Sequence, residues 1–262
     1  MTVERASNLA RADILSSKRW KRMRSHTAVL LDCDGVLVDN ISFEKAVTRF
    51  LVERLASFLQ VPLERATTLW NQELSDSKGS PRWYDYDFHC QRLGLPKLAR
   101  EAHAEASHLL VRMPEAEKTY AMLLDAGIKV SIATDAVRWV VEYKLDGLGF
   151  PEPFLILSSD MLPATKSSVH YWRAYRTQYP SDDVCIVVDN RLINLDTAGT
   201  VLPDADLICF VGDEHVLQLS GIVGQNQLET RASDTPIDIV VDHYDLMEQI
   251  VDFLVKGKPD KP

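Results

Sequence analysis

Six short apolar segments, separated by helical patterns, constrain the fold of this 262-residue chain most strongly. They are rich in Val, Ile and Leu and barely alternate with polar residues, which is typical of strands covered on both faces in a parallel sheet. These segments are residues 28–31, 129–134, 154–158, 184–188, 207–211 and 237–241. Their alternation with helices predicts an α/β fold with a doubly wound, mostly parallel, Rossmann-like sheet.

Helical patterns occupy the intervals between these segments. Residues 114–127 carry Pro114, which suits a first helical turn, and Gly127, which suits a C-terminal cap. Asp135 has the position of an N-cap for the next helix. Residues 244–255 predict a helix that closes the core.

The stretch between the first two strands is too long for a simple crossover and contains no convincing strand pattern. One helical stripe of apolar side chains in it comprises Phe43, Val47, Phe50, Leu51, Leu55 and Phe58. We therefore expect residues 41–112 to form a small helical domain inserted into a core of residues 27–40 and 113–256. Residues 1–26 would then be a basic N-terminal arm, and residues 257–262 a tail.

The charge balance limits the partners that the protein can have. A net charge of −9 argues against nucleic acid or an anionic membrane as the main partner. A small phosphorylated substrate is compatible with it, because a local metal ion or lysine reverses the field. The basic stretch Lys18–Arg24 is interpreted as a solvated arm or helix face.

The cysteines and the hydropathy pattern predict a cytoplasmic protein. The four cysteines, at positions 33, 90, 185 and 209, form no C-x-x-C pair, so buried free thiols in a reducing compartment are expected. The basic stretch before residue 28 has the outline of a secretory signal, but two aspartates interrupt the apolar segment that follows. No segment of the sequence is apolar for long enough to predict a membrane span.

Polar side chains follow four of the predicted strands at the point where each strand ends. In an open α/β sheet, ligands bind beyond the carboxyl ends of the strands, so four chain segments bring these groups to one edge. The residues are Asp32 and Asp34 after the first strand, Thr134 after the second, Lys166 after the third, and Asp189 and Asn190 after the fourth.

Several of these segments are similar to the motifs of a known family. LLDCDGVLVD (residues 30–39) matches a first motif in which Asp is followed two residues later by Asp-Gly, and VSIATD (130–135) resembles a second motif ending in Ser or Thr. Lys166 resembles the third-motif lysine, for which Lys144 is a rival inside a predicted helix. VVDNRLINLDTAG (187–199) resembles the acidic fourth motif. The chain thus resembles the haloacid dehalogenase-like hydrolase superfamily, and the inserted domain resembles that family's helical cap.

The resemblance implies a phosphatase that forms an aspartyl-phosphate. A carboxylate can attack phosphorus when a cation holds its charge and the target is held in line, and Asp32 would be this nucleophile. Asp34 would protonate the leaving oxygen and later deprotonate water. Thr134 would donate a hydrogen bond to a phosphoryl oxygen, and Lys166 would hold both Asp32 and the phosphate.

The resemblance also implies Mg²⁺ as the cofactor, since the available ligands are hard oxygens. The metal ligands would be Asp32, the backbone carbonyl of Asp34, and the fourth-motif residues Asp189 and Asn190. Mg²⁺ in this position would neutralise charge on the transferring group.

The fourth motif departs from the family pattern of two acids or Gly-Asp. With Asn194 and Ala198 as register marks, Asp189 takes the first acidic position and Asn190 the second. An amide offers an oxygen but no charge, and the lost charge weakens metal binding by on the order of a few kcal/mol at an effective dielectric constant of 20. Either Asp189 takes over, or metal affinity is low, or the protein is not a catalyst. Our hypothesis is the first, because the first- and third-motif residues are intact.

Candidate substrate contacts lie mainly in SPRWYDYDFHCQRLGL, residues 80–95. We expect Arg82, Tyr84 and His89, together with Asp135 of the core, to contact the leaving group. For the aromatic rings of this segment we favour the alternative that they fill the interior of the inserted domain.

The sequence leaves three functional interpretations open. Asp34 favours phosphoryl chemistry, because the resemblance implies that dehalogenases lack an acid at that position. A phosphatase acting on a small phosphorylated metabolite is expected, and no residue distinguishes it from a phosphomutase. Asn190 keeps open a catalytically silent relative with a binding or regulatory role. The sequence does not set the oligomeric state.

Overall fold

The structure is a computed structural model that describes most of the chain. It covers residues 27–210 and 239–241, apart from residues 96, 126, 163, 180–182 and 204. The predicted arm, closing helix and tail lie outside the described residues. Within the described part, no helix combines the length and apolar character that a bilayer span needs.

A six-stranded sheet with the order β5-β4-β1-β6-β7-β8 forms the core. All neighbouring strands pair in parallel. The strands are β1 (Thr27–Leu31), β4 (Lys129–Ala133), β5 (Leu155–Leu157), β6 (Asp183–Asp189), β7 (Asp206–Phe210) and β8 (Ile239–Val241). Each of the six predicted apolar segments contributes one strand, so the predicted α/β fold class is confirmed.

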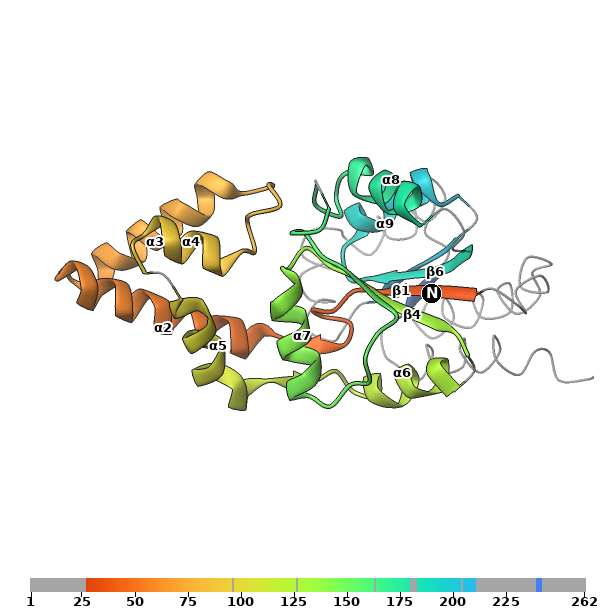
Figure 1. Cartoon of the computed structure of the whole chain (residues 1–262), viewed down its shortest axis with the longest axis horizontal. Coiled ribbons are helices and arrows are strands. Elements are labelled where there is room, and N and C mark those ends of the chain that lie inside the picture. Colours follow the sequence, from red (N-terminus) through yellow and green to blue (C-terminus); the bar gives the residue numbers. More distant parts are fainter. Residues whose placement is uncertain are drawn as a thin grey trace, which may run out of the picture.

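Helices cover both faces of the sheet, as Figure 1 shows. They are α6 (Ala116–Asp125), α7 (Arg138–Gly147), α8 (Val169–Gln178) and α9 (Leu192–Val201). Val29 and Leu31 of β1 belong to the apolar cluster of α6 and α7, whereas Leu30 belongs to the cluster of α8 and α9. Because successive side chains of a strand point to opposite faces, this double burial explains why the strand sequences barely alternate.

The strand order places the end of β1 at the point where the direction of winding changes. β1 lies between β4 and β6, and the chain builds the sheet outward on either side of it. Such a switch point creates a crevice beyond the carboxyl ends of the strands. Asp32 is the first residue after β1, and its backbone N–H donates to Val188 O at 2.9 Å, which fixes it at this crevice.

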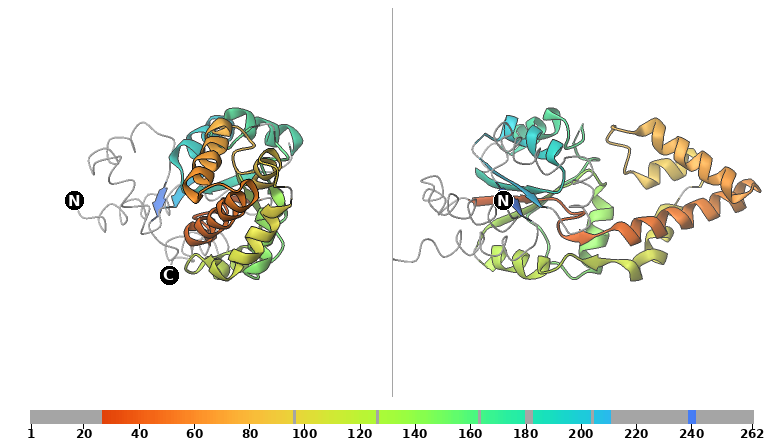
Figure 2. Two further views of the ribbon diagram at one scale, coloured as in Figure 1. Left: turned by 90° about the vertical axis from the view of Figure 1, so that its left-hand side faces the viewer. Right: turned by 180° about the vertical axis from the view of Figure 1, so that it is seen from behind.

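The residues between β1 and α6 form a helical insert that extends away from the core (Figure 2). It comprises α2 (Ile41–Leu59), α3 (Leu63–Ser77), α4 (Tyr86–Arg92), α5 (Leu98–Ala106) and the 3-10 turn η2 (Ser107–Leu109). These helices share an apolar cluster of their own, against which Trp139 and Tyr143 of α7 also pack. An antiparallel ribbon of β2 (Val38–Asp39) and β3 (Val111–Arg112) joins the two ends of the insert.

The predicted apolar stripe of α2 is mostly buried. Phe43, Val47, Leu51 and Leu55 are fully buried in the cluster of the insert, and Phe50 packs partly against it. Phe58, in the last turn of the helix, is instead 58% exposed. The apolar stripe therefore extends about one turn beyond the buried part of the helix.

Candidate active site

Two aspartates and a lysine from three chain segments meet at the carboxyl edge of the sheet. Lys166 Nζ, from the loop between β5 and α8, lies 2.7 Å from Asp32 Oδ1 and 2.7 Å from Asp189 Oδ2. All three side chains are buried. We call these three residues the Lys166 cluster. The structure thus brings together groups that the sequence predicted at the ends of the first and fourth strands and after the third.

Lys166 is held in place through both its backbone and its side chain. Its N–H donates to Asp135 Oδ1 at 2.7 Å, and its carbonyl accepts from Trp172 Nε1 at 2.8 Å and Thr197 Oγ1 at 2.6 Å. Burial alone would lower its pKa, but the adjacent carboxylates outweigh burial and raise it, so the ammonium stays charged. A buried ammonium needs such partners, which excludes the alternative of an ordinary surface lysine.

The Asp32 carboxylate keeps one oxygen available. Its Oδ1 accepts from Lys166 Nζ and from the Cys33 N–H at 2.8 Å. Within the described residues, Oδ2 takes part in no hydrogen bond or ion pair. Burial raises the pKa of Asp32 to about 8, with repulsion from Asp189 adding to the shift and Lys166 opposing it. A second cation beside Oδ2 would stabilise the ionised form that a nucleophile requires.

A second buried lysine, Lys144, holds Asp34, whereas the sequence suggested Lys144 only as a rival for the third-motif lysine. Lys144 Nζ lies 2.8 Å from Asp34 Oδ1 and 2.7 Å from Glu44 Oε1 of α2. We call Asp34, Lys144 and Glu44 the Lys144 cluster. In the sequence, Lys144 occupies the same helical stripe as Val140 and Val141, and a lysine on an apolar stripe signals a buried charge that needs partners.

The two clusters leave a charge imbalance at the sheet edge. Each contains one lysine and two carboxylates, so together they carry two net negative charges when all groups are ionised. This imbalance suits a divalent cation or a cationic ligand.

The contacts of the fourth-motif residues Asp189 and Asn190 suggest roles that differ from those in the sequence-based hypothesis. Asp189 Oδ1 accepts from the Arg191 N–H at 2.8 Å and from Asn194 Nδ2 at 3.0 Å, while its Oδ2 accepts from Lys166 Nζ and from Asn194 Nδ2 at 3.1 Å. With both oxygens engaged, Asp189 is suited to holding Lys166 rather than to replacing Asn190 as a metal ligand. Asn190 Nδ2 donates to the Asp34 carbonyl at 3.2 Å, so its amide lies beside the second expected ligand.

Three oxygen atoms near the end of β1 are suitable ligands for a hard cation, and they belong to a carboxylate, a backbone carbonyl and an amide. Asp32 Oδ2, the Asp34 carbonyl and, after rotation of its amide, Asn190 Oδ1 are hard oxygen donors near the end of β1. No group of three or more His, Cys, Asp or Glu side chains within the described residues is arranged to hold a metal ion. A magnesium site here therefore depends on carbonyl and amide oxygens in addition to one carboxylate.

Thr134 and Asp135 lie directly after β4, but only Thr134 has the character expected of a ligand-binding residue. Thr134 Oγ1 accepts from the Ala136 N–H at 3.1 Å and keeps its own hydrogen for donation. Asp135 is not the N-cap of α7, because the helix begins at Arg138 after Val137. Its carboxylate instead holds the Lys166 loop. We therefore interpret Asp135 as a positioning residue rather than a substrate contact.

The three candidate contacts in the insert have different environments. His89 is fully buried, with Nδ1 at 3.2 Å from Glu73 Oε1 and Nε2 at 3.1 Å from Trp83 O, so it belongs to the interior of the insert. Arg82 Nη1 pairs with Asp85 Oδ2 at 2.6 Å.

Tyr84, in the loop between α3 and α4, is the third candidate substrate contact of the insert. Burial raises its pKa, and the charges of Arg191, Asp135, Asp32 and Asp34 act on its hydroxyl. Tyr84 therefore remains a candidate for substrate binding.

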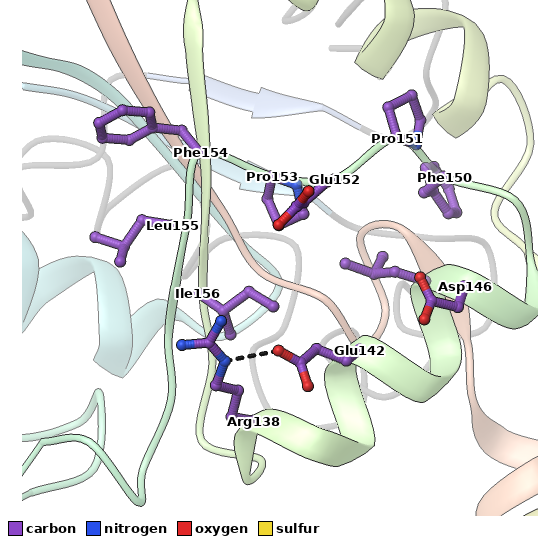
Figure 3. Close-up of a pocket in the computed structure, with 11 residues that line it drawn as sticks. Arg138, Glu142, Asp146, Phe150, Pro151, Glu152, Pro153, Phe154, Leu155 and Ile156 are labelled. Carbon is purple, nitrogen blue, oxygen red and sulfur yellow. Dashed lines mark hydrogen bonds and ion pairs between the residues drawn. The ribbon is translucent and has the colours of Figure 1, made fainter.

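Among the described residues we compare two cavities as possible binding sites, one between the insert and the core and one beside α7. One of about 210 Å³ separates the insert from the core and is lined by Pro81, Arg82, Asp85, Val137, Ser159, Asp160 and Leu162. The other, of about 390 Å³, lies beside α7 and β5 around the Arg138–Glu142 ion pair (Figure 3). None of the predicted catalytic residues lines either cavity, but the first includes Arg82, a candidate substrate contact, and lies where the insert meets the core.

Comparison with solved structures identifies the fold. The chain is similar to the crystal structure of a HAD phosphatase from Thermococcus onnurineus, with a TM-score of 0.67 and 18% identity over 86% of this chain and 97% of that chain. It is also similar to CbbY from Rhodobacter sphaeroides in complex with phosphate, with a TM-score of 0.51 and 17% identity over 84% and 95% of the two chains. The chain has the haloacid dehalogenase-like hydrolase fold.

The chain is also similar to a solved structure of the same fold whose named activity is different. The L-2-haloacid dehalogenase from Xanthobacter autotrophicus matches with a TM-score of 0.51 and 15% identity, over 90% of this chain and 100% of that chain. No protein-family model matches the sequence, and the search of curated proteins gives no match. The fold alone therefore does not decide between phosphatase and dehalogenase chemistry.

Replacing Lys166 with Met should destabilise the protein, because two buried carboxylates lose their shared cation. We expect the free energy of unfolding to fall by about 3–5 kcal/mol at pH 8. The pKa of Asp32 would rise further above its value in the unfolded chain, so the folded state would bind more protons and the loss would shrink toward pH 5. Urea denaturation at both pH values measures this. The exposed Lys45→Met is the matched control, and an equal loss at both pH values would contradict the assignment.

Proposed function

We propose that the protein is a magnesium-dependent phosphatase that hydrolyses a small phosphate monoester through an aspartyl-phosphate. The observation that carries the proposal is the bridge of Lys166 between Asp32 and Asp189, which leaves Asp32 Oδ2 available beside an ammonium group. An ionised carboxylate oxygen next to a fixed cation, at the switch point of an α/β sheet, suits attack on a bound phosphoryl group.

In the first proposed step, Asp32 Oδ2 forms a bond to phosphorus while the bond from phosphorus to the ester oxygen breaks. Asp34 gives its proton to that oxygen, and the alcohol leaves. Lys166 and Thr134 donate hydrogen bonds to the phosphoryl oxygens. Mg²⁺ held by Asp32, the Asp34 carbonyl and Asn190 would neutralise part of the charge on the transferring group.

In the second step, water attacks phosphorus and the bond from phosphorus to Asp32 breaks. Asp34 accepts a proton from the attacking water, which returns Asp34 to its protonated form. Inorganic phosphate then leaves, and Asp32 is free for another cycle. The same residues would serve a phosphomutase if an alcohol replaced the water.

The helical insert would act as a cap that excludes water and selects the substrate. Arg82, a predicted substrate contact, lines the cavity of about 210 Å³ where the insert meets the core, and its position supports this proposal. Asp34, which can protonate an ester oxygen, favours phosphatase over dehalogenase chemistry.

A catalytically silent relative is the second candidate, and Asn190 is the observation that favours it. The amide brings no charge to the metal site, and its Nδ2 donates to the carbonyl that would bind the metal. The binding role would then use the same crevice without turnover. A panel of phosphate esters separates the two candidates.

Asp32→Asn should abolish hydrolysis, because an amide cannot form the aspartyl-phosphate. We expect the wild-type protein to hydrolyse p-nitrophenyl phosphate only with Mg²⁺, and the variant to lose activity by on the order of 10⁴-fold or more. Asp146→Asn, at an exposed position of α7, is the matched control. No wild-type turnover on a broad phosphate-ester panel would support the silent relative instead.

Asn190→Asp should tighten magnesium binding, since it restores a charge beside the cation. One added unit charge at short range predicts at least a tenfold lower Mg²⁺ concentration for half-maximal activity. A magnesium titration of the wild type and the variant measures this shift. If Mg²⁺ affects neither protein, the metal-dependent scheme is wrong.

A further inference from the structure

The Lys144 cluster connects the core to the helical insert through one buried ammonium group and two partly buried carboxylates. Lys144 lies on α7 of the core and its side chain is 1% exposed. One of its partners, Asp34, follows β1, whereas the other, Glu44, lies on α2 of the insert. Glu44 Oε2 also accepts from the Tyr86 hydroxyl of α4 at 2.6 Å. The chain of contacts therefore runs from the interior of the insert to an active-site carboxyl group.

Lys144 contacts only one oxygen of Asp34. Its ammonium lies 2.8 Å from Asp34 Oδ1, and Oδ2 takes part in no hydrogen bond or ion pair within the part of the chain that the structure describes. The Asp34 side chain is 28% exposed, so its carboxyl group is partly open to a ligand. The backbone of Asp34 is held separately by the amide of Asn190 at its carbonyl. This arrangement restricts the rotation of the carboxyl group and leaves one oxygen for proton exchange.

Stability alone does not account for a lysine at position 144. A buried ion pair contributes little net stability compared with well-packed apolar residues of similar volume. The neighbouring buried positions of α7 are Val140, Val141 and Leu145, so an apolar side chain would suit the same stripe. A charged residue that is costly to bury, and whose partner lies in the candidate active site, indicates a functional role.

We propose that Lys144 and Glu44 are positioning residues for Asp34, an inference that rests on the proposed phosphatase function. Lys144 fixes Asp34 Oδ1 so that Oδ2 faces the ester oxygen of the leaving group. Glu44 fixes the Lys144 ammonium from the insert, so the orientation of the general acid depends on contact between insert and core.

The dependence of rate on the leaving group tests this role. p-Nitrophenyl phosphate has a good leaving group that needs little protonation, whereas phenyl phosphate and glycerol 2-phosphate depend more on a general acid. Lys144→Met should lower kcat/KM for the poorer leaving groups by about 10²-fold more than for p-nitrophenyl phosphate. Glu44→Gln should show the same selectivity to a smaller extent, about tenfold. A purely structural role would lower all rates by one common factor.

A double-mutant cycle sharpens the test. Asp34→Asn removes the acid itself, so adding Lys144→Met to it should produce no further leaving-group selectivity. Lys45→Met on the exposed surface of α2 is the control for loss of a lysine. If Lys144→Met fails to fold by circular dichroism, Glu44→Gln decides, because it removes one partly buried charge while keeping the shape of the side chain.

The outcomes separate this inference from the proposed function. An active wild type with selective losses in Lys144→Met or Glu44→Gln supports the positioning role. An active wild type with equal losses on all substrates overturns the positioning role and leaves the phosphatase intact. A wild type without turnover on any phosphate ester overturns both.

Discussion

The arrangement on which the site depends is the placement of two buried ammonium groups, each between two carboxylates, at one edge of the sheet. Isolated buried charges would be too costly, and each lysine makes two carboxylates tolerable. The two clusters involve the ends of β1 and β6, the loop after β5, and the helices α7 and α2. The parallel sheet supplies this convergence, because its strands all end at the same edge.

The clusters also divide the chemistry between the two parts of the protein. The Lys166 cluster lies wholly in the core and holds the proposed nucleophile. The Lys144 cluster includes a residue of the insert and holds the proposed acid. Helix α7 carries Lys144 and also packs against the insert, since the Tyr143 hydroxyl donates to His103 O of α5 at 3.1 Å and the Arg100 guanidinium lies 4.4 Å from the Trp139 ring centroid. Contact between insert and core therefore bears directly on the geometry of the site.

Much of the fold could be predicted from the sequence because its signals are local. Strands buried on both faces read as continuous apolar runs, and the residues that follow them must lie at one sheet edge. The positions of Asp32, Lys166 and Asp189 followed from this rule. The two-residue ribbon of β2 and β3 is too short to leave a periodic pattern.

The remaining features depend on tertiary contacts that no local pattern encodes. Asp135 suits a helix cap in sequence, but its carboxylate holds the Lys166 loop instead. His89 is a residue type that can bind a ligand, but its two ring nitrogens lie within hydrogen-bond distance of Glu73 and a backbone carbonyl inside the insert. Lys144 finds Glu44 a hundred residues away in the sequence, so only its place on an apolar stripe hinted at burial.

Trapping the covalent intermediate tests the central claim most directly. The protein would be mixed with a ³²P-labelled phosphate monoester and Mg²⁺, quenched in acid within milliseconds, and digested for peptide analysis. An aspartyl-phosphate predicts acid-stable, hydroxylamine-labile label on the peptide that contains Asp32. Label on a different residue, or undiminished turnover by the Asp32→Asn variant, would contradict the account.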